Sequence, residues 1–178
     1  AVFPLENSNR ISKLHIVESV QLQIPQLTLE LVDAINLIDK FGLQDGTLIT
    51  ISLSRQGTII HTLTFRLFSY KVEQQNYVQI YTITGYLDIP KYWFGMAQAS
   101  IRGTSTDALK QIANECGLSF VGVPTSNSQL WMPNLNKYCD FAKYIADRGY
   151  ASVSSCLVLG ITLMKTMIYA DIMNLASP

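Results

Sequence analysis

The sequence predicts an α+β protein: an antiparallel β-barrel or sandwich with an inserted two-helix segment and C-terminal strands. Three observations favour this class. The first hundred residues contain apolar residues at alternate positions between turn residues, two later stretches space them as a helix does, and residues 157–169 return to strand character. We therefore expect a strand-rich part at residues 1–101, a helical segment at 102–150 and strands that complete the barrel at 151–178, within one domain.

Two strands are expected near the start of the sequence. In the first, apolar residues fall on even positions: Leu14, Ile16, Val20, Leu22 and Ile24. In the second they fall on odd positions: Leu27, Leu29 and Leu31. Pro25 separates the two runs, and because proline cannot donate to a ladder, we expect a bend or an edge position there. Residues 33–42 fit a short helical turn or a connection equally well.

Hairpins are expected next. Asp45-Gly46 is a turn signal, and the strand after it places Ile49, Ile51 and Leu53 on one face. Residues 54–57 form a second turn before an alternating run over residues 59–72. The polar residues 73–76 then close a second hairpin, and residues 77–89 are rich in the β-branched and aromatic residues that suit a pleated sheet.

Two amphipathic helices follow. The first carries an apolar stripe at i, i+3, i+4 and i+7: Leu109, Ile112, Ala113 and Cys116. Thr104, Ser105 or Thr106 can cap its start and Gly117 its end. The stripe of the second consists of Tyr138, Phe141, Ala142 and Ile145, and Gly149 ends it. A loop with a brief strand at residues 119–123 joins the two helices.

Composition excludes several classes of function. Thirteen basic and thirteen acidic residues give a formal net charge of zero without a basic stripe, so nucleic-acid sequence recognition is not expected. Only 15% of residues are charged and 48% are hydrophobic, which favours burial in an assembly. The apolar run at residues 157–169 is too short to span a bilayer and contains Lys165, so we expect no membrane span. No secretory leader is expected at the start of the sequence.

The three cysteines, Cys116, Cys139 and Cys156, show no CxxC spacing, so neither a disulfide framework nor a metal site is expected. A catalytic pair of Cys116 or Cys139 with a histidine stays open, because such partners meet only in the fold. Both cysteines nevertheless fit apolar or flanking helix positions, where a thiol behaves as a small hydrophobe. His15 is expected to be exposed and His61 partly buried.

The carboxylates do not suggest catalysis either. Asp107 lies at a helix start, where a negative charge is favoured without any function. Glu115, Asp140 and Asp147 are interpreted as solvated charges. The sequence contains no motif for phosphate binding, dinucleotide binding, a nucleophilic serine or a zinc protease. We therefore predict a protein that is not an enzyme, with no catalytic residue, no cofactor and no metal.

Aromatic residues offer one alternative function. Tyr92, Trp93 and Phe94 form a cluster, and Trp131 follows in the loop between the helices. Such residues line peptide or glycan grooves in some proteins, but large aromatic side chains are more often packed in a core. Packing is the favoured interpretation, subunit contact the second, and a non-catalytic peptide- or glycan-binding β-barrel module the alternative function.

Three motifs carry a family resemblance. They are a glycine turn before a strand at Gly46, the segment GTSTDALKQIANECGL at residues 103–118, and FAKYIADRG at residues 141–149. The matching positions of the two helices are Thr104, Ser105, Asp107, Ala108, Leu109, Ile112, Ala113, Gly117 and Leu118, then Phe141, Ile145, Ala146, Arg148 and Gly149. In their order and spacing they resemble the hub proteins of contractile phage-tail baseplates, which are related to late-control tail proteins and to spike proteins of type VI secretion.

The resemblance implies a structural role. The barrel would be a tube-like domain, and copies of the chain would form a ring, a trimer in such hubs, that adapts the tail tube to the central spike. The implied partners are therefore the chain itself, the tail tube protein, the central spike and other baseplate proteins. The implied location is the tail baseplate of the virion, assembled in the host cytoplasm. Hubs of this kind usually carry a second tube domain, so the number of copies stays open between three and six.

Overall fold

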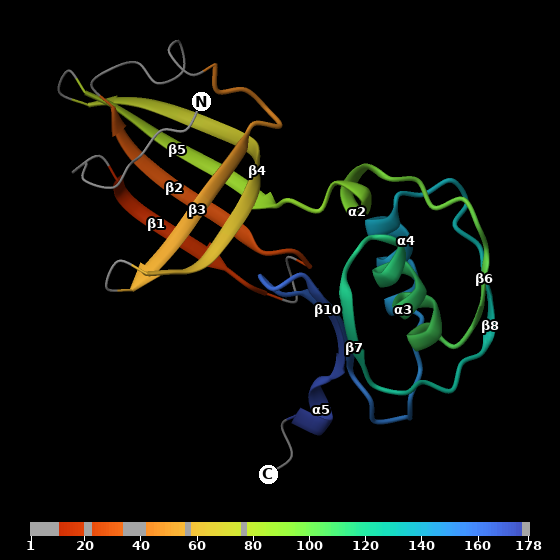
Figure 1. Ribbon diagram of the computed structural model, residues 1–178. Helices are drawn as coiled ribbons and strands as arrows, with labels where there is room; N and C mark the ends of the chain where they lie inside the picture. The colour runs from red at the N-terminus through yellow and green to blue at the C-terminus, as the bar shows by residue number, and fades with distance from the viewer. Residues whose placement is uncertain (1–10, 20–22, 34–41, 56–57, 76–77, 176–178) are drawn as a thin grey trace. The chain divides into compact units, whose positions relative to one another are not determined.

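The computed structural model describes residues 11–19, 23–33, 42–55, 58–75 and 78–175 (Figure 1). The chain forms two compact units. The first comprises Ala1–Glu18 and Pro25–Asp88, and the second comprises Ser19–Ile24 and Ile89–Pro178.

The first unit is an antiparallel sheet of five strands. These are β1 (Ile11–Val17), β2 (Gln26–Asp33), β3 (Leu48–Arg55), β4 (Thr58–Gln75) and β5 (Val78–Leu87). Their order across the sheet is β1-β2-β5-β4-β3, and the sheet curls into a half-barrel on which β3 and β4 cross the other strands (Figure 1). Together with the helices of the second unit, this sheet confirms the predicted α+β class.

One face of the sheet is apolar and the other polar, as the alternation predicts. Leu27, Leu29 and Leu31 on β2 are buried, which confirms the odd-position face. The buried side chains beside them come from the two neighbouring long strands: Leu63, Phe65 and Leu67 on β4, and Tyr81, Ile83 and Leu87 on β5. The opposite face of these strands carries mainly threonine and charged residues.

The strand β2 lies between β1 and β5, so the edge position suggested by Pro25 is not observed. Pro25 precedes the first ladder pair, Gln26 with Tyr86, and a bend lies just before it. Its missing N–H therefore costs the ladder nothing, while its carbonyl accepts a hydrogen bond from Leu87 N at 3.0 Å.

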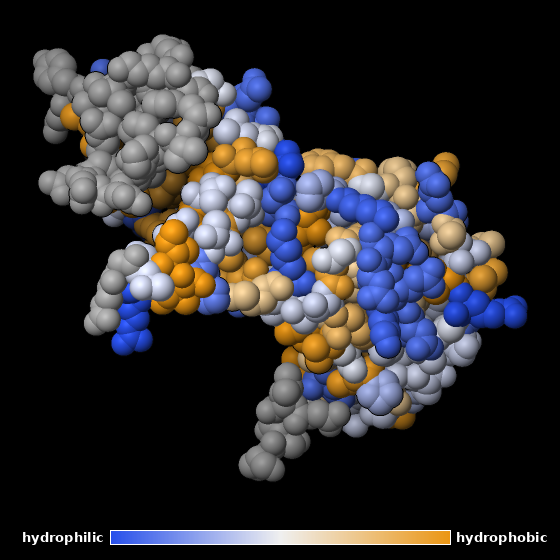
Figure 2. Space-filling model, in the orientation of Figure 1, coloured by the Kyte–Doolittle hydropathy of each residue, from blue (hydrophilic) through white to orange (hydrophobic). Residues whose placement is uncertain are grey.

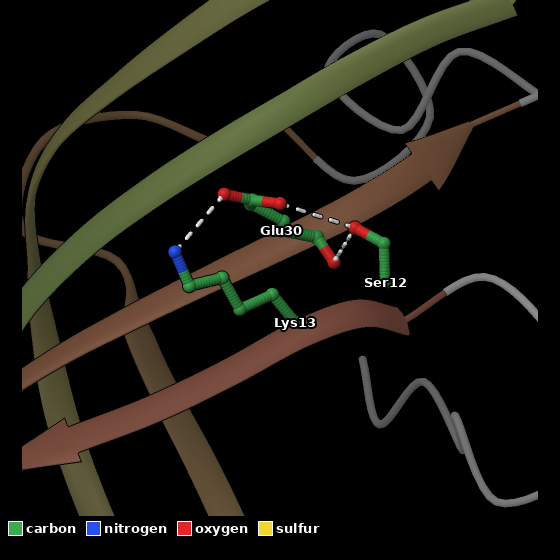
Figure 3. A network of polar contacts seen from close by, with 3 residues as sticks. All are labelled: Ser12, Lys13 and Glu30. Carbon is green, nitrogen blue, oxygen red and sulfur yellow. Dashed lines mark hydrogen bonds and ion pairs between the residues drawn. The ribbon is translucent and has the colours of Figure 1, made fainter.

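The strand β1 is one edge of the sheet. Leu14 on its apolar face is 42% exposed, so the predicted half-buried face is only partly covered. On the polar face, Lys13 Nζ lies 3.7 Å from a Glu30 carboxylate oxygen, and Ser12 Oγ donates to Glu30 O at 3.3 Å (Figure 3). Both contacts are largely exposed and contribute about 0.2–1 kcal/mol at most, so they help to align β1 with β2 more than they stabilise the pair. Val20 and Leu22 of the predicted strand lie outside the described residues. So does most of segment 33–42, for which the sequence fits a helical turn and a connection equally well.

The long strand β4 changes partner along its length. Residues 58–66 pair with β3, and residues 65–75 pair with β5 on the other side, with a bulge between Leu67 and Ser69. The predicted turn at Asp45-Gly46 is confirmed. Arg66 holds this turn, because its Nε lies 2.8 Å from Asp88 Oδ1 while its Nη1 donates to Gly46 O at 3.1 Å. The second hairpin turns later than predicted, since residues 73–75 still belong to β4.

The second unit contains the helices. Its elements begin with α2 (Pro90–Phe94) and β6 (Ile101–Gly103). Next come the two long helices and the strands between them: α3 (Ser105–Glu115), β7 (Ser119–Gly122), β8 (Gln129–Trp131) and α4 (Tyr138–Ala146). The unit ends with β9 (Leu157–Ile161), β10 (Thr166–Asp171) and α5 (Ile172–Leu175). Both predicted helices and the brief strand at 119–123 are thus confirmed. No helix among the described residues is long and apolar enough to cross a membrane.

The helix α3 begins as its sequence predicts. Of the three candidate caps, Thr104 is the N-cap: Asp107 N donates to Thr104 Oγ1 at 3.2 Å and Thr104 N donates to Asp107 Oδ2 at 3.0 Å. This reciprocal capping box satisfies two backbone donors that would otherwise lack a partner. At the other end Gly117 adopts a φ of 72°, a left-handed conformation that suits glycine.

The C-terminal strands differ from the expectation that residues 151–178 complete the barrel. Instead β10 pairs antiparallel with β9 and parallel with β7, which gives a separate sheet in the order β7-β10-β9. Met167 and Tyr169 on β10 are fully buried, because the second unit has its own apolar core.

A close contact joins α4 to this second sheet. Tyr169 Oη donates to Ala146 O at 3.2 Å, at the end of α4. Gly149 makes the approach possible, because a Cβ atom there would overlap Tyr169 Oη and lie 2.9 Å from Tyr169 Cζ. Gly149 was predicted to end the helix, but α4 already ends at Ala146, and its more specific role is to leave space for the tyrosine.

Candidate interaction surfaces

The histidines and cysteines weighed for catalysis are divided between the two units. His15 and His61 lie on β1 and β4 of the first unit, whereas Cys116 and Cys139 belong to the second unit. Both histidines are exposed, which confirms the expectation for His15 and corrects the one for His61. His61 follows the buried side of β4 by alternation, but it lies in the part of the hairpin beyond the covered core.

The surroundings of the two helical cysteines disfavour the thiolate form. Cys116 and Cys139 are half-buried, so Cys116 is less enclosed than its place on the helix stripe predicts. Burial raises the pKa of Cys116 to about 12 and also raises the pKa of Cys139. A nucleophilic cysteine needs a lowered pKa, so both thiols have the opposite of the required shift.

The carboxylates are placed as structural or solvated groups. Asp140 and Asp147 are exposed, as predicted. Asp107 caps α3, and its hydrogen bonds with Thr104 lower the pKa of the carboxyl. The described residues contain no group of three histidine, cysteine, aspartate or glutamate side chains that could hold a metal ion.

Glu115 is less isolated than predicted. Tyr138 Oη on α4 donates to Glu115 Oε2 at the end of α3 at 2.5 Å, and Gln111 Nε2 donates to Glu115 Oε1 at 3.1 Å. The bond from Tyr138 is the main reason that the pKa of Glu115 is lowered, and the same bond raises the pKa of Tyr138 to about 12. This pair fastens the two helices together and was not visible in the sequence.

Two of the aromatic residues, Tyr92 and Trp131, are packed in the core of the second unit. Tyr92 is fully buried and Trp131 is 1% exposed, with its Nε1 donating to Gly103 O at 3.0 Å. Trp131 also meets Tyr144 edge to face, with ring centroids 6.3 Å apart. Phe94, by contrast, is 60% exposed. The buried members fit the favoured packing interpretation and cannot line an open groove.

A partly buried polar cluster around the buried Ser105 secures the loop between the helices. Ser105 Oγ lies 2.9 Å from both Thr125 Oγ1 and Asn127 Oδ1, and Asn127 Nδ2 donates to Arg148 O at 2.9 Å. Thr106 Oγ1 donates to Val123 O. Satisfied polar groups of this kind specify a loop conformation, so Ser105 and Thr106 hold the loop while Thr104 caps the helix.

The first unit exposes apolar side chains that a partner could cover. At the tip of the β3–β4 hairpin, Leu53, Ile59 and Ile60 are 38%, 63% and 53% exposed. We call these three residues the hairpin patch, and Figure 2 shows apolar atoms beside this tip. Apolar side chains gathered on a protruding hairpin typically mark a surface that a partner covers.

A second feature is an unpaired length of strand. On the side of β4 that faces β3, the last paired residue is Leu67, which donates to Thr47 O at 2.8 Å. Residues 69–75, the open stretch of β4, have no partner on that side among the described residues. Tyr70 and Val72 within it are 39% and 41% exposed. An open strand edge is a template for pairing with another chain.

The chain matches no protein-family model and no curated protein. Its fold is similar to that of the 43 kDa tail protein of prophage MuSo2 from Shewanella oneidensis, with a TM-score of 0.58 and 9% identity over 90% of this chain and 51% of that one. It is also similar to a tail protein from Neisseria meningitidis MC58, with a TM-score of 0.52 and 15% identity over 92% of this chain and 47% of the other.

A third similar structure is prophage tail protein gp18 from Listeria monocytogenes EGD-e, with a TM-score of 0.53 and 12% identity over 91% of this chain and 45% of that one. The chain thus spans about half the length of these tail proteins. At such identities the likeness demonstrates a shared fold.

Proposed function

We propose that this chain is a non-catalytic structural component of a phage tail, and more specifically a part of the baseplate hub that adapts the tail tube to the central spike. The observation that carries the proposal is the likeness of fold over nine-tenths of the chain to three prophage tail proteins. The family resemblance of the two helices supports the finer assignment to a hub. Its location would be the virion tail baseplate, with assembly in the host cytoplasm.

The surface of the first unit supports an assembled state. The hairpin patch and the open stretch of β4 leave apolar side chains and backbone groups uncovered, which is costly for a chain that works alone. Neighbouring subunits in a closed ring would cover them. The partners in this proposal are copies of the chain, the tail tube protein, the central spike and other baseplate proteins.

The alternative, a peptide- or glycan-binding module, finds less support. Its candidate residues are split between the buried Tyr92 and Trp131 and the exposed Phe94. Replacing Trp93 by alanine would separate the two functions, because a ligand site would lose binding while assembly continued.

The proposal is tested by mass photometry of the purified chain, alone and with the tail tube and spike proteins of the same phage. We expect rings of one defined stoichiometry and a complex with at least one of the two proteins. A variant with Ile59 and Ile60 replaced by lysine should associate less, whereas Lys110→Ala on the exposed side of α3 should behave as the unmodified chain. A stable monomer that binds neither protein would refute the proposal.

A further inference from the structure

Two open strand edges of the first unit's sheet run antiparallel to each other and have matching length, while the outer side of β3 is a third open edge among the described strands and runs parallel to β1. One is β1, which has seven residues and no partner on its outer side among the described strands. The other is the open stretch of β4, residues 69–75, at the opposite end of the four strands β1-β2-β5-β4. The strand β3 does not close this second edge, because it pairs only with the first half of β4.

The directions of the two edges are complementary. Three successive antiparallel pairings, β1 with β2, β2 with β5 and β5 with β4, make β1 antiparallel to β4. Rotation about a ring axis preserves strand direction relative to that axis, so β1 of one copy meets β4 of the next in an antiparallel orientation.

The faces of the two edges match as well. Leu14 pairs with the buried Leu29, and Val72 pairs with the buried Tyr81, so both point to the apolar face. Leu14 is 42% exposed and Val72 is 41% exposed, because each lies on a strand edge with no described neighbouring strand on its outer side to cover the side chain. Joining the edges would continue one apolar face from copy to copy.

We propose that β1 of one copy adds to the open stretch of β4 in the next copy, with Leu14 opposite Val72. This inference rests on the ring that the proposed function implies. In this register Ile16 lies opposite Tyr70 on the apolar face, and Lys13 lies opposite Glu73 on the polar face. The polar face then carries an alternating row of charges across the junction, since Lys13 already pairs with Glu30 and Lys71 with Glu73.

Neighbouring registers are worse. A shift of two residues in one direction places Lys13 opposite Lys71, and like charges directly opposite are destabilising. The same shift in the other direction places Leu14 opposite Gln74 and loses an apolar pair. A shift of one residue turns the apolar side chains to the polar face.

Cysteine cross-linking tests the junction in the full chain. Two single variants, His15→Cys and Lys71→Cys, are made with Cys156→Ser, which removes the exposed native thiol. The two positions face each other in the proposed register, where Cβ atoms lie about 4.5–5.5 Å apart, close enough for mild oxidation to form a disulfide. We expect co-expressed variants to give at least tenfold more disulfide-linked dimer than either variant alone. The matched control pairs His15→Cys with Lys110→Cys on α3, which should give no dimer above background.

Each other outcome has a definite meaning. A dimer from His15→Cys alone would show that β1 pairs with itself and would overturn the head-to-tail junction. Rings in mass photometry without a cross-link in the mixture would overturn the junction while the proposed function stands. A chain that stays monomeric throughout would overturn both.

A second measurement does not depend on disulfide geometry. Val72→Asp places a charge on the apolar face of the junction, so we expect loss of rings with unchanged far-UV circular dichroism. Thr62→Asp lies on the polar face of β4 outside the open stretch and should keep the rings. Rings that persist in Val72→Asp would also overturn the junction.

Discussion

Replacing Gly149 by alanine tests the close contact between α4 and the second sheet. The new Cβ atom would overlap Tyr169 Oη, lie 2.9 Å from Tyr169 Cζ and lie 3.1 Å from Leu157 Cδ1. Tyr169 is fully buried, so its ring cannot swing into solvent. The substitution must therefore move the tyrosine or the backbone at the end of α4.

The expected cost follows from two effects. Overpacking a well-filled site costs about 1–3 kcal/mol. Displacing Tyr169 also breaks its hydrogen bond to Ala146 O, which contributes about 1 kcal/mol. We expect Gly149→Ala to lower the free energy of unfolding by about 2–4 kcal/mol, a large part of what a typical domain has.

The assay is urea unfolding followed by tryptophan fluorescence. The two tryptophans, Trp93 and Trp131, both belong to the second unit, so the signal reports on the unit that contains Gly149. Tyr169→Phe is the companion variant, because it removes the overlapping oxygen. The double variant should be at least about 1 kcal/mol more stable than the sum of the single effects predicts. A loss below about 0.5 kcal/mol for Gly149→Ala would refute the packing argument, since that is the range of ordinary surface changes.

Three further predictions concern the helices. Thr104→Ala removes the N-cap of α3 and should destabilise the second unit by about 1 kcal/mol in the same urea assay, with Thr104→Ser close to the unmodified chain. Tyr138→Phe should cost about 1 kcal/mol at pH 7, less than the roughly 1.5–3 kcal/mol of a bond to a fully buried charged group, because Glu115 is partly exposed. The pKa of Glu115 is lowered in the fold, so the stabilisation from this bond is complete above the ordinary glutamate pKa and disappears as the pH falls through the folded pKa. Unequal stabilities of the unmodified chain and Tyr138→Phe at pH 2 would contradict this. Cys139→Ser and Asp140→Asn should leave tail assembly and infectivity unchanged, and loss of infectivity with intact tails would reopen a catalytic role.

Local patterns predicted the elements well, because each depends on neighbours along the chain. The alternation at Leu27, Leu29 and Leu31 identified the buried face of β2, and the residues around Thr104 identified the start of α3. Gly117 likewise indicated the end of that helix. Periodicity and capping act within a few residues, so one sequence contains the necessary information.

Long-range pairing could not be predicted in this way. The C-terminal strands have the same alternating character as those of the first unit, and nothing local says that β10 pairs with β7 and β9. The bond from Tyr138 to Glu115 joins residues 23 positions apart, and the role of Gly149 depends on Tyr169 on a different element. His61 was expected to be partly buried because alternation shows which face a residue takes, but not whether anything covers that face.

The change of partner along β4 also determines how force would pass through the first unit. The strand pairs with β3 over residues 58–66 and with β5 over residues 65–75, so a pull on the β3–β4 hairpin travels along one continuous backbone. In an antiparallel ladder the hydrogen bonds are perpendicular to the strands, so the bonds to β5 resist a pull along β4 together and not one after another. A pull across the sheet would instead open the pairs in sequence, which makes the unit mechanically stiffer along β4 than across it.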